Sequence, residues 1–186
     1  KNKDGIRYIK SCKWFTKIWK SYKHNDIIYM YYLQDIPKLN STYWLYDVGI
    51  EFDMCPTITD VSVLGTVHTL SLYRCPNITN VAALKTVHNL TLYKCNVADV
   101  SALGTVHTLR LDYCIKITDV SALGTVHTLT LNTCPKLTDV SALGTVHTLT
   151  LSHCYNITTD ISALGTVHDL AIYNCSNITY LGLCIF

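Results

Sequence analysis

The tripeptide Thr-Val-His recurs six times in this chain, and its period constrains the fold more than any other feature. The copies begin at residues 66, 86, 105, 125, 145 and 166, so successive steps are 20, 19, 20, 20 and 21 residues. A nearly constant step of this length is typical of a solenoid, in which each repeat packs only against its neighbours. Most positions of a repeat are then needed for stacking, so we expect function to depend on the positions that vary.

Each repeat combines a strand pattern with a turn pattern. In the first copy, Leu70 and Leu72 alternate with Ser71 and Tyr73, and this period of two predicts a short strand. After the following cysteine, most repeats read close to Ile-Thr-Asp-Val-Ser-Ala-Leu-Gly. The Asp can accept the first free N–H groups of a helical turn, and we expect the Gly to end that turn. Twenty residues leave no room for a long helix, so we predict 3₁₀ turns opposite the strands.

The order of leucines and cysteines, LxxLxLxx(N/C)xL, resembles the leucine-rich repeat family over residues 49–186. The short repeats are similar to those of bacterial internalins, and the cysteine resembles the cysteine-containing repeats of F-box proteins. This resemblance implies one right-handed α/β-repeat solenoid of about six 20-residue repeats. Its parallel sheet would form the concave face and its 3₁₀ turns the convex face. We expect seven strands, the first of them irregular and near Ile50 and Phe52.

Residues 1–48 differ from the repeats in charge and pattern. They hold nine Lys or Arg against four Asp, whereas the rest of the chain holds six basic and nine acidic residues. This balance gives the repeats no strong field for nucleic acid. The apolar spacing predicts an amphipathic helix over residues 5–24 and a second over Ile27–Ile36, ended by Pro37. We interpret the segment as a helical N-terminal cap, and a helix lying on a membrane surface is the alternative.

The stretch Ser11–Phe15, followed by Ile18 and Trp19, resembles the last helix of an F-box, although the Leu-Pro and acidic opening of that motif is absent. The resemblance implies docking to a ubiquitin-ligase adaptor, with the repeats holding the substrate. Chains that combine such a remnant with uniform repeats also resemble proteins of giant DNA viruses of amoebae. That second resemblance implies a viral protein in the host-cell cytoplasm or the virion.

Seven of the nine cysteines occur once per repeat, at residues 55, 75, 95, 114, 134, 154 and 175. This spacing predicts an inward-facing ladder of buried thiols, with disulfides or a metal site as the alternatives. Free thiols favour a reducing compartment, so we expect a cytoplasmic location. The apolar run Ile27–Leu33 is too short to span a bilayer.

The sequence contains no G-x-S-x-G, Walker, H-E-x-x-H or C-x-x-C motif, so we predict no enzymatic activity and no cofactor. The best candidate for chemistry is a column of imidazoles about 5 Å apart. It consists of His68, His88, His107, His127, His147 and His168. Neighbouring imidazoles could bind a metal, or the column could be a surface feature preserved by duplication. We expect no carboxylate or cysteine to join the column, and therefore no metal site.

The exposed positions of the strands vary most at their third and fourth columns. These columns hold Tyr and Arg, the residue types that dominate binding energy. The candidate contact residues are Tyr73, Arg74, Tyr93, Lys94, Arg110, Asp112, Tyr113 and Tyr173. The alternative is that the tyrosines only cover the ends of strands.

From these patterns we expect a non-catalytic protein–protein interaction module that uses the concave face and the N-terminal helices. Its most specific form would be a substrate receptor of a ubiquitin ligase. The alternative is a structural or assembly component, for example of a viral particle, that associates with other copies through the solenoid ends.

Overall fold

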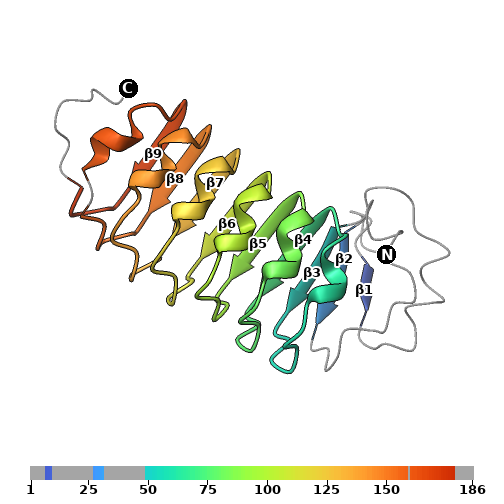
Figure 1. The fold of residues 1–186 in the computed structure, drawn as a ribbon. Helices are drawn as coiled ribbons and strands as arrows, with labels where there is room; N and C mark the ends of the chain where they lie inside the picture. The colour runs from blue at the N-terminus through green and yellow to red at the C-terminus, as the bar shows by residue number, and fades with distance from the viewer. Residues whose placement is uncertain (1–6, 10–26, 32–48, 159, 179–186) are drawn as a thin grey trace.

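The computed structural model describes residues 7–9, 27–31 and 49–178 except Thr159. In these residues, nine parallel strands form one sheet whose spatial order follows the chain (Figure 1). The strands are β1 Arg7–Ile9, β2 Ile27–Tyr31, β3 Gly49–Asp53, β4 Thr69–Tyr73, β5 Asn89–Tyr93, β6 Thr108–Asp112, β7 Thr128–Asn132, β8 Thr148–Ser152 and β9 Asp169–Tyr173. From β3 onward, equivalent residues of successive repeats pair directly, as Leu70 does with Leu90. The sequence period therefore becomes the register of the sheet.

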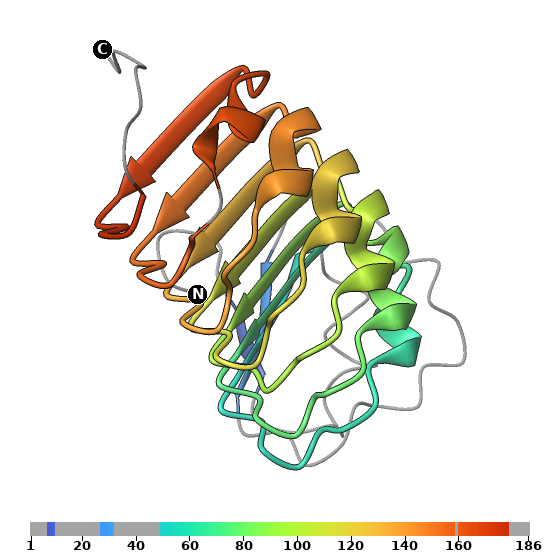
Figure 2. The same cartoon turned by 60° about the vertical axis from the view of Figure 1, so that its left-hand side comes forward.

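A row of 3₁₀ turns lies opposite the strands from β4 onward, and one face of the sheet stays open (Figure 2). The turns are η3 Ser62–Leu64, η4 Ala82–Thr86, η5 Ser101–Thr105, η6 Ser121–Thr125, η7 Ser141–Thr145 and η8 Ile161–Leu164. The core lies between the two layers. Leu129 and Leu131 of β7 and Leu123 of η6 are completely buried, as are their counterparts in most repeats. The predicted solenoid, its parallel sheet and its 3₁₀ turns are confirmed.

The N-terminal segment differs from the prediction where the structure describes it. Arg7–Ile9 and Ile27–Tyr31 are strands that pair in parallel with the sheet, so the prediction of helices is wrong at these residues. The sheet extends by two strands beyond the seven that we expected. A short apolar run is compatible with either a helix or a strand, and pairing with the neighbouring strand, β3 for β2 and β2 for β1, selects the strand. The remainder of the predicted cap, including the F-box-like stretch, lies outside the described residues.

Aspartates begin the turns as predicted. The Asp60, Asp119 and Asp139 Oδ1 atoms each accept a hydrogen bond of 2.8 Å from the backbone N–H two residues later. Asn80, which departs from the repeat, accepts the same bond from the Ala82 N–H at 3.0 Å. These bonds lower the pKa of Asp60 and Asp119. Asn80 therefore has the same structural role as Asp.

The recurring turn glycine ends the turn, as predicted, at Gly65 and Gly165, but has a different role in the three repeats from η5 to η7. Gly104, Gly124 and Gly144 lie inside 3₁₀ turns instead of ending them. A Cβ atom at Gly104 would lie 2.3 Å from the carbonyl oxygen of Ala122 in the next turn, and one at Gly124 would lie 2.5 Å from that of Ala142. Glycine at these two positions thus lets adjacent turns approach each other closely.

A threonine ladder also joins the turns. The Thr125 hydroxyl donates to the Gly104 carbonyl, and the Thr145 hydroxyl to the Gly124 carbonyl, both at 2.7 Å. Thr105 makes the equivalent bond of 2.6 Å to the Lys85 carbonyl. Since the acceptor is a backbone atom, the replacement of glycine by Lys85 leaves the ladder continuous. The first residue of Thr-Val-His is therefore explained by stacking.

Candidate binding surface and histidine column

Three tyrosines form a continuous aromatic group on the open face of the sheet. Tyr73 and Tyr93 end β4 and β5, and Tyr113 follows β6. The ring centroids of Tyr73 and Tyr93 lie 5.5 Å apart, and those of Tyr93 and Tyr113 lie 5.6 Å apart in an edge-to-face arrangement. Both separations lie in the range in which aromatic pairs attract. Because each ring comes from a different repeat, the group crosses three repeats.

Lys94 lies against this aromatic group. Its Nζ atom is 5.2 Å from the ring centroids of both Tyr93 and Tyr113, a distance at which a cation is attracted to an aromatic face. The backbone explains this position, because Lys94 has a φ of 52° and so leaves the line of the strand. From the sequence, we placed Lys94 and its equivalents in the other repeats, the fourth column, within the strands. That prediction is wrong. The column members Met54, Arg74, Lys94, Tyr113, Thr133, His153 and Asn174 all have positive φ and follow the strands.

Arg110 and Asp112 lie on the same face of β6. The Arg110 Nε atom donates to the Asp112 Oδ2 atom at 2.7 Å. Asp112 is only 5% exposed, whereas the Arg110 side chain is 49% exposed. The Asp112 Oδ1 atom is buried and has no hydrogen-bond partner. Asp112 therefore holds Arg110 from beneath, and Arg110 presents the available surface.

Arg74 and Tyr173 lie outside this group for different reasons. The Arg74 guanidinium makes two hydrogen bonds, of 2.9 and 2.6 Å, to the carboxylate of Asp53 in β3. Tyr173 is 57% exposed at the end of β9, three strands away from β6. We define the tyrosine patch as Tyr73, Tyr93, Lys94, Arg110 and Tyr113. The structure brings these five predicted residues together.

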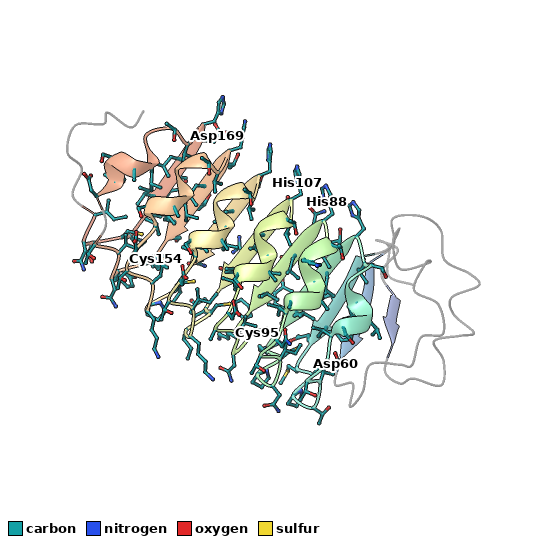
Figure 3. All side chains as sticks on the ribbon, viewed as in Figure 1. Asp60, His88, Cys95, His107, Cys154 and Asp169 are labelled. Carbon is teal, nitrogen blue, oxygen red and sulfur yellow. The ribbon has the colours of Figure 1, made fainter. Side chains whose placement is uncertain are left out.

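The histidines form a stacked column along one edge of the solenoid, and His88 and His107 project from this edge in Figure 3. Neighbouring ring centroids are 4.5–4.6 Å apart, with interplanar angles of 10–18°. The Nδ1 atoms of His127 and His147 each lie 3.2 Å from the hydroxyl of the following threonine. Loss of hydration between the rings, followed by the charges that His88 and His127 can carry, lowers the pKa of His107.

A carboxylate joins the column at its last member, contrary to our expectation from the sequence. The Asp169 Oδ1 atom lies 3.2 Å from His168 Nδ1. Asp169 occupies the position that holds Thr128 and Thr148 in the two preceding repeats. Asp169 follows His168 directly in the sequence. We overlooked it as a neighbour of the column because we treated the repeats as uniform.

The cysteine ladder lies inside the solenoid. All seven repeat cysteines are buried free thiols. The Cys114 Sγ atom lies 3.6 Å from the carbonyl oxygens of both Leu92 and Asp112. Burial raises the pKa of Cys95 to about 11 and that of Cys114 to about 12. Cys95 and Cys114 therefore stay protonated, and the seven buried side chains fill the core.

Comparison with known proteins identifies the architecture. The chain is similar to an internalin, inlF, from Listeria monocytogenes, with 19% identity and a TM-score of 0.51 over 83% of this chain. It is also similar to an internalin C2 from the same organism, with 18% identity and a TM-score of 0.51 over 79% of this chain. The fold is that of a leucine-rich-repeat solenoid. This chain spans 50% of the first internalin and 67% of the second.

No family model and no curated protein sequence matches the chain. At these identities, the likeness to internalins concerns the fold. Among the described residues, no helix has the length and apolar character needed to cross a membrane.

Proposed function

We propose that this leucine-rich-repeat solenoid is a non-catalytic protein-binding module that contacts its partner through the tyrosine patch. The observation that carries the proposal is the continuous group of Tyr73, Tyr93 and Tyr113, with Lys94 over two of the rings. Tyrosine and arginine are enriched among the residues that dominate binding energy. A tyrosine ring offers a large contact area with few rotatable bonds, so little conformational entropy is lost on binding.

The neighbouring repeats provide a contrast on the same face. At the first and second exposed columns, β7 and β8 present Thr128, Thr130, Thr148 and Thr150. Threonine suits a strand but is under-represented among residues that dominate binding. We infer that a partner is held mainly over β4, β5 and β6, and that the threonine face of β7 and β8 contributes little.

The test begins with the identification of a partner by affinity capture and mass spectrometry, followed by measurement of its affinity with purified proteins. The triple variant Tyr73→Ala, Tyr93→Ala, Tyr113→Ala should weaken binding by at least roughly 100-fold, since residues of this kind each contribute about 1–2 kcal/mol or more. The control Thr130→Ala, Thr150→Ala changes the same face and should retain the wild-type affinity. Equal affinity of the triple variant and the wild type would refute the proposal.

The more specific roles depend on other parts of the chain. A substrate receptor of a ubiquitin ligase would need residues 11–19 to bind the ligase adaptor, and the cytoplasmic location that we propose is compatible with that role. Co-purification with the adaptor, abolished by Trp14→Ala and Trp19→Ala, is the expected result for a receptor. If the protein is instead an assembly component, we expect to find the chain within an ordered particle.

A further inference from the structure

The last two described repeats bring two imidazoles and a carboxylate to one place on the surface. His147 precedes β8, and His168 precedes Asp169, the first residue of β9. One ligand atom from each of these three residues lies within 4.8 Å of the other two. Among the described residues, no other set of three or more His, Cys, Asp or Glu side chains has its possible ligand atoms this close together.

The chemistry of this group favours a particular class of ion. Imidazole nitrogen suits Zn²⁺, Cu²⁺ and Ni²⁺, whereas Mg²⁺ and Ca²⁺ prefer sites made of oxygen ligands. Two His and one carboxylate, with a fourth position open to water, is a known ligand set for Zn²⁺. We therefore propose that His147, His168 and Asp169 form a surface site for a divalent transition-metal ion, with Zn²⁺ as its representative.

The distances are compatible with closure around an ion. Ligand atoms at about 2.0–2.2 Å from a tetrahedral Zn²⁺ lie about 3.3–3.6 Å apart, so a pair of atoms now 4.8 Å apart must approach by roughly 1.2–1.5 Å. The side chains of His168 and Asp169 are 71% and 60% exposed, which leaves them room to rotate. Closure around an ion would tilt the His168 ring out of its stack on His147, whose ring centroid is 4.6 Å away. The ion would replace the present contact between His168 Nδ1 and Asp169 Oδ1.

The Thr148 hydroxyl contacts two of the three ligands. Its Oγ1 atom lies 3.2 Å from His147 Nδ1 and donates to the Asp169 Oδ2 atom at 3.4 Å. Hydrogen bonds of this kind orient metal ligands and are themselves important for affinity. The same hydroxyl therefore connects the histidine of one repeat to the carboxylate of the next.

The position of the site indicates what the ion would do. β9 is the most exposed of the repeat strands, since Leu170 and Ile172 are only partly buried, whereas the matching leucines of β8 are fully buried. An ion held by His147 and by the two ligands of the following repeat joins β8 to β9. The ion would therefore stabilise the end of the described sheet by binding only the folded state.

The repeat supplies both a loss-of-function and a gain-of-function variant. Asp169→Thr restores the residue found at this position in four earlier repeats, so the fold should be retained. Thr128→Asp places a carboxylate beside His107 and His127 in the same arrangement. The two sites share no ligand.

The experiment titrates the full chain with ZnCl₂ at pH 7.5 and measures binding by isothermal titration calorimetry. The wild type should bind one ion, Asp169→Thr should bind at least about tenfold more weakly, and Thr128→Asp should bind two. With Co²⁺ as a second probe, the spectrum should lack thiolate charge-transfer absorption, because the repeat cysteines are buried. Unchanged affinity in Asp169→Thr, or a thiolate spectrum, would overturn the assignment.

Discussion

At the scale of single residues, the repeat assigns each side chain to one structural task. The Thr125 hydroxyl bonds the preceding turn, the His127 ring stacks on its neighbours, and Leu129 fills the core. Gly124 leaves room for the close approach of the next turn. Because a Cβ at this position would lie 2.5 Å from the Ala142 carbonyl oxygen, two adjacent turns would have to separate.

We predict that Gly124→Ala destabilises the chain by about 1–3 kcal/mol, the usual effect of overpacking. None of the turn glycines has a positive φ, so the expected loss comes from the steric contact and not from the backbone conformation. Gly165→Ala is the matched control, since the nearest atom to its new Cβ is 3.2 Å away, on Ser162 of the same turn. Chemical denaturation measures both variants, and equal stability of the two would show that the close approach is unimportant.

At the scale of the elements, the columns of identical residues create interactions that single repeats lack. The histidine column is the clearest case, because each interior imidazole has another on both sides at 4.5–4.6 Å. Protonation of one ring then opposes protonation of the next. This effect follows from stacking, and a repeat in isolation would not show it.

We predict that His107 titrates below 6.5 in the folded chain, since desolvation and the charges of His88 and His127 lower its pKa. Protonation is then harder in the folded than in the unfolded state, so stability is complete above pH 6.5 and falls as the pH decreases through the unfolded value. NMR titration in the presence of a metal chelator measures this pKa. The double variant His88→Asn, His127→Asn should raise it toward 6.5, and an unchanged value would contradict the role of the column.

The sequence predicts these elements to different degrees. Strands β4 to β9 follow from alternation that is repeated six times, so each copy supports the others. The strands at Arg7–Ile9 and Ile27–Tyr31 have no such support, because Ile27–Tyr31 is fixed by pairing with β3 and Arg7–Ile9 by pairing with Ile27–Tyr31. The left-handed column was also missed, since Lys94 and Tyr113 are not residues that favour positive φ.

At the scale of the whole molecule, the solenoid separates its surfaces by task. The interior holds leucines and thiols, one edge holds the histidine column, and the open sheet face holds the tyrosine patch. The sequence predicted the members of the patch from their departure from the repeat. It did not predict that Asp112 is buried beneath Arg110, because simple alternation makes every third-column residue exposed.

Repeat β7 supplies a version of this surface without the patch. Asn132 of the β7 repeat is equivalent to Tyr73, Tyr93 and Asp112. Thr133 is equivalent to Lys94 and Tyr113. Thr130 is equivalent to Arg110. Transfer of these residues removes the patch with side chains that the same fold already accepts. Asp112→Asn is included because loss of Arg110 would otherwise leave a buried carboxylate unpaired.

The most direct test of the account is therefore partner affinity and melting temperature in the variant Tyr73→Asn, Tyr93→Asn, Lys94→Thr, Arg110→Thr, Asp112→Asn, Tyr113→Thr. We predict a melting temperature within about 4 °C of the wild type, which corresponds to about 1 kcal/mol for a chain of this size. Partner affinity should fall by roughly 100-fold or more. A variant that melts normally and binds the partner as tightly as the wild type would contradict the central claim that the tyrosine patch is the binding surface.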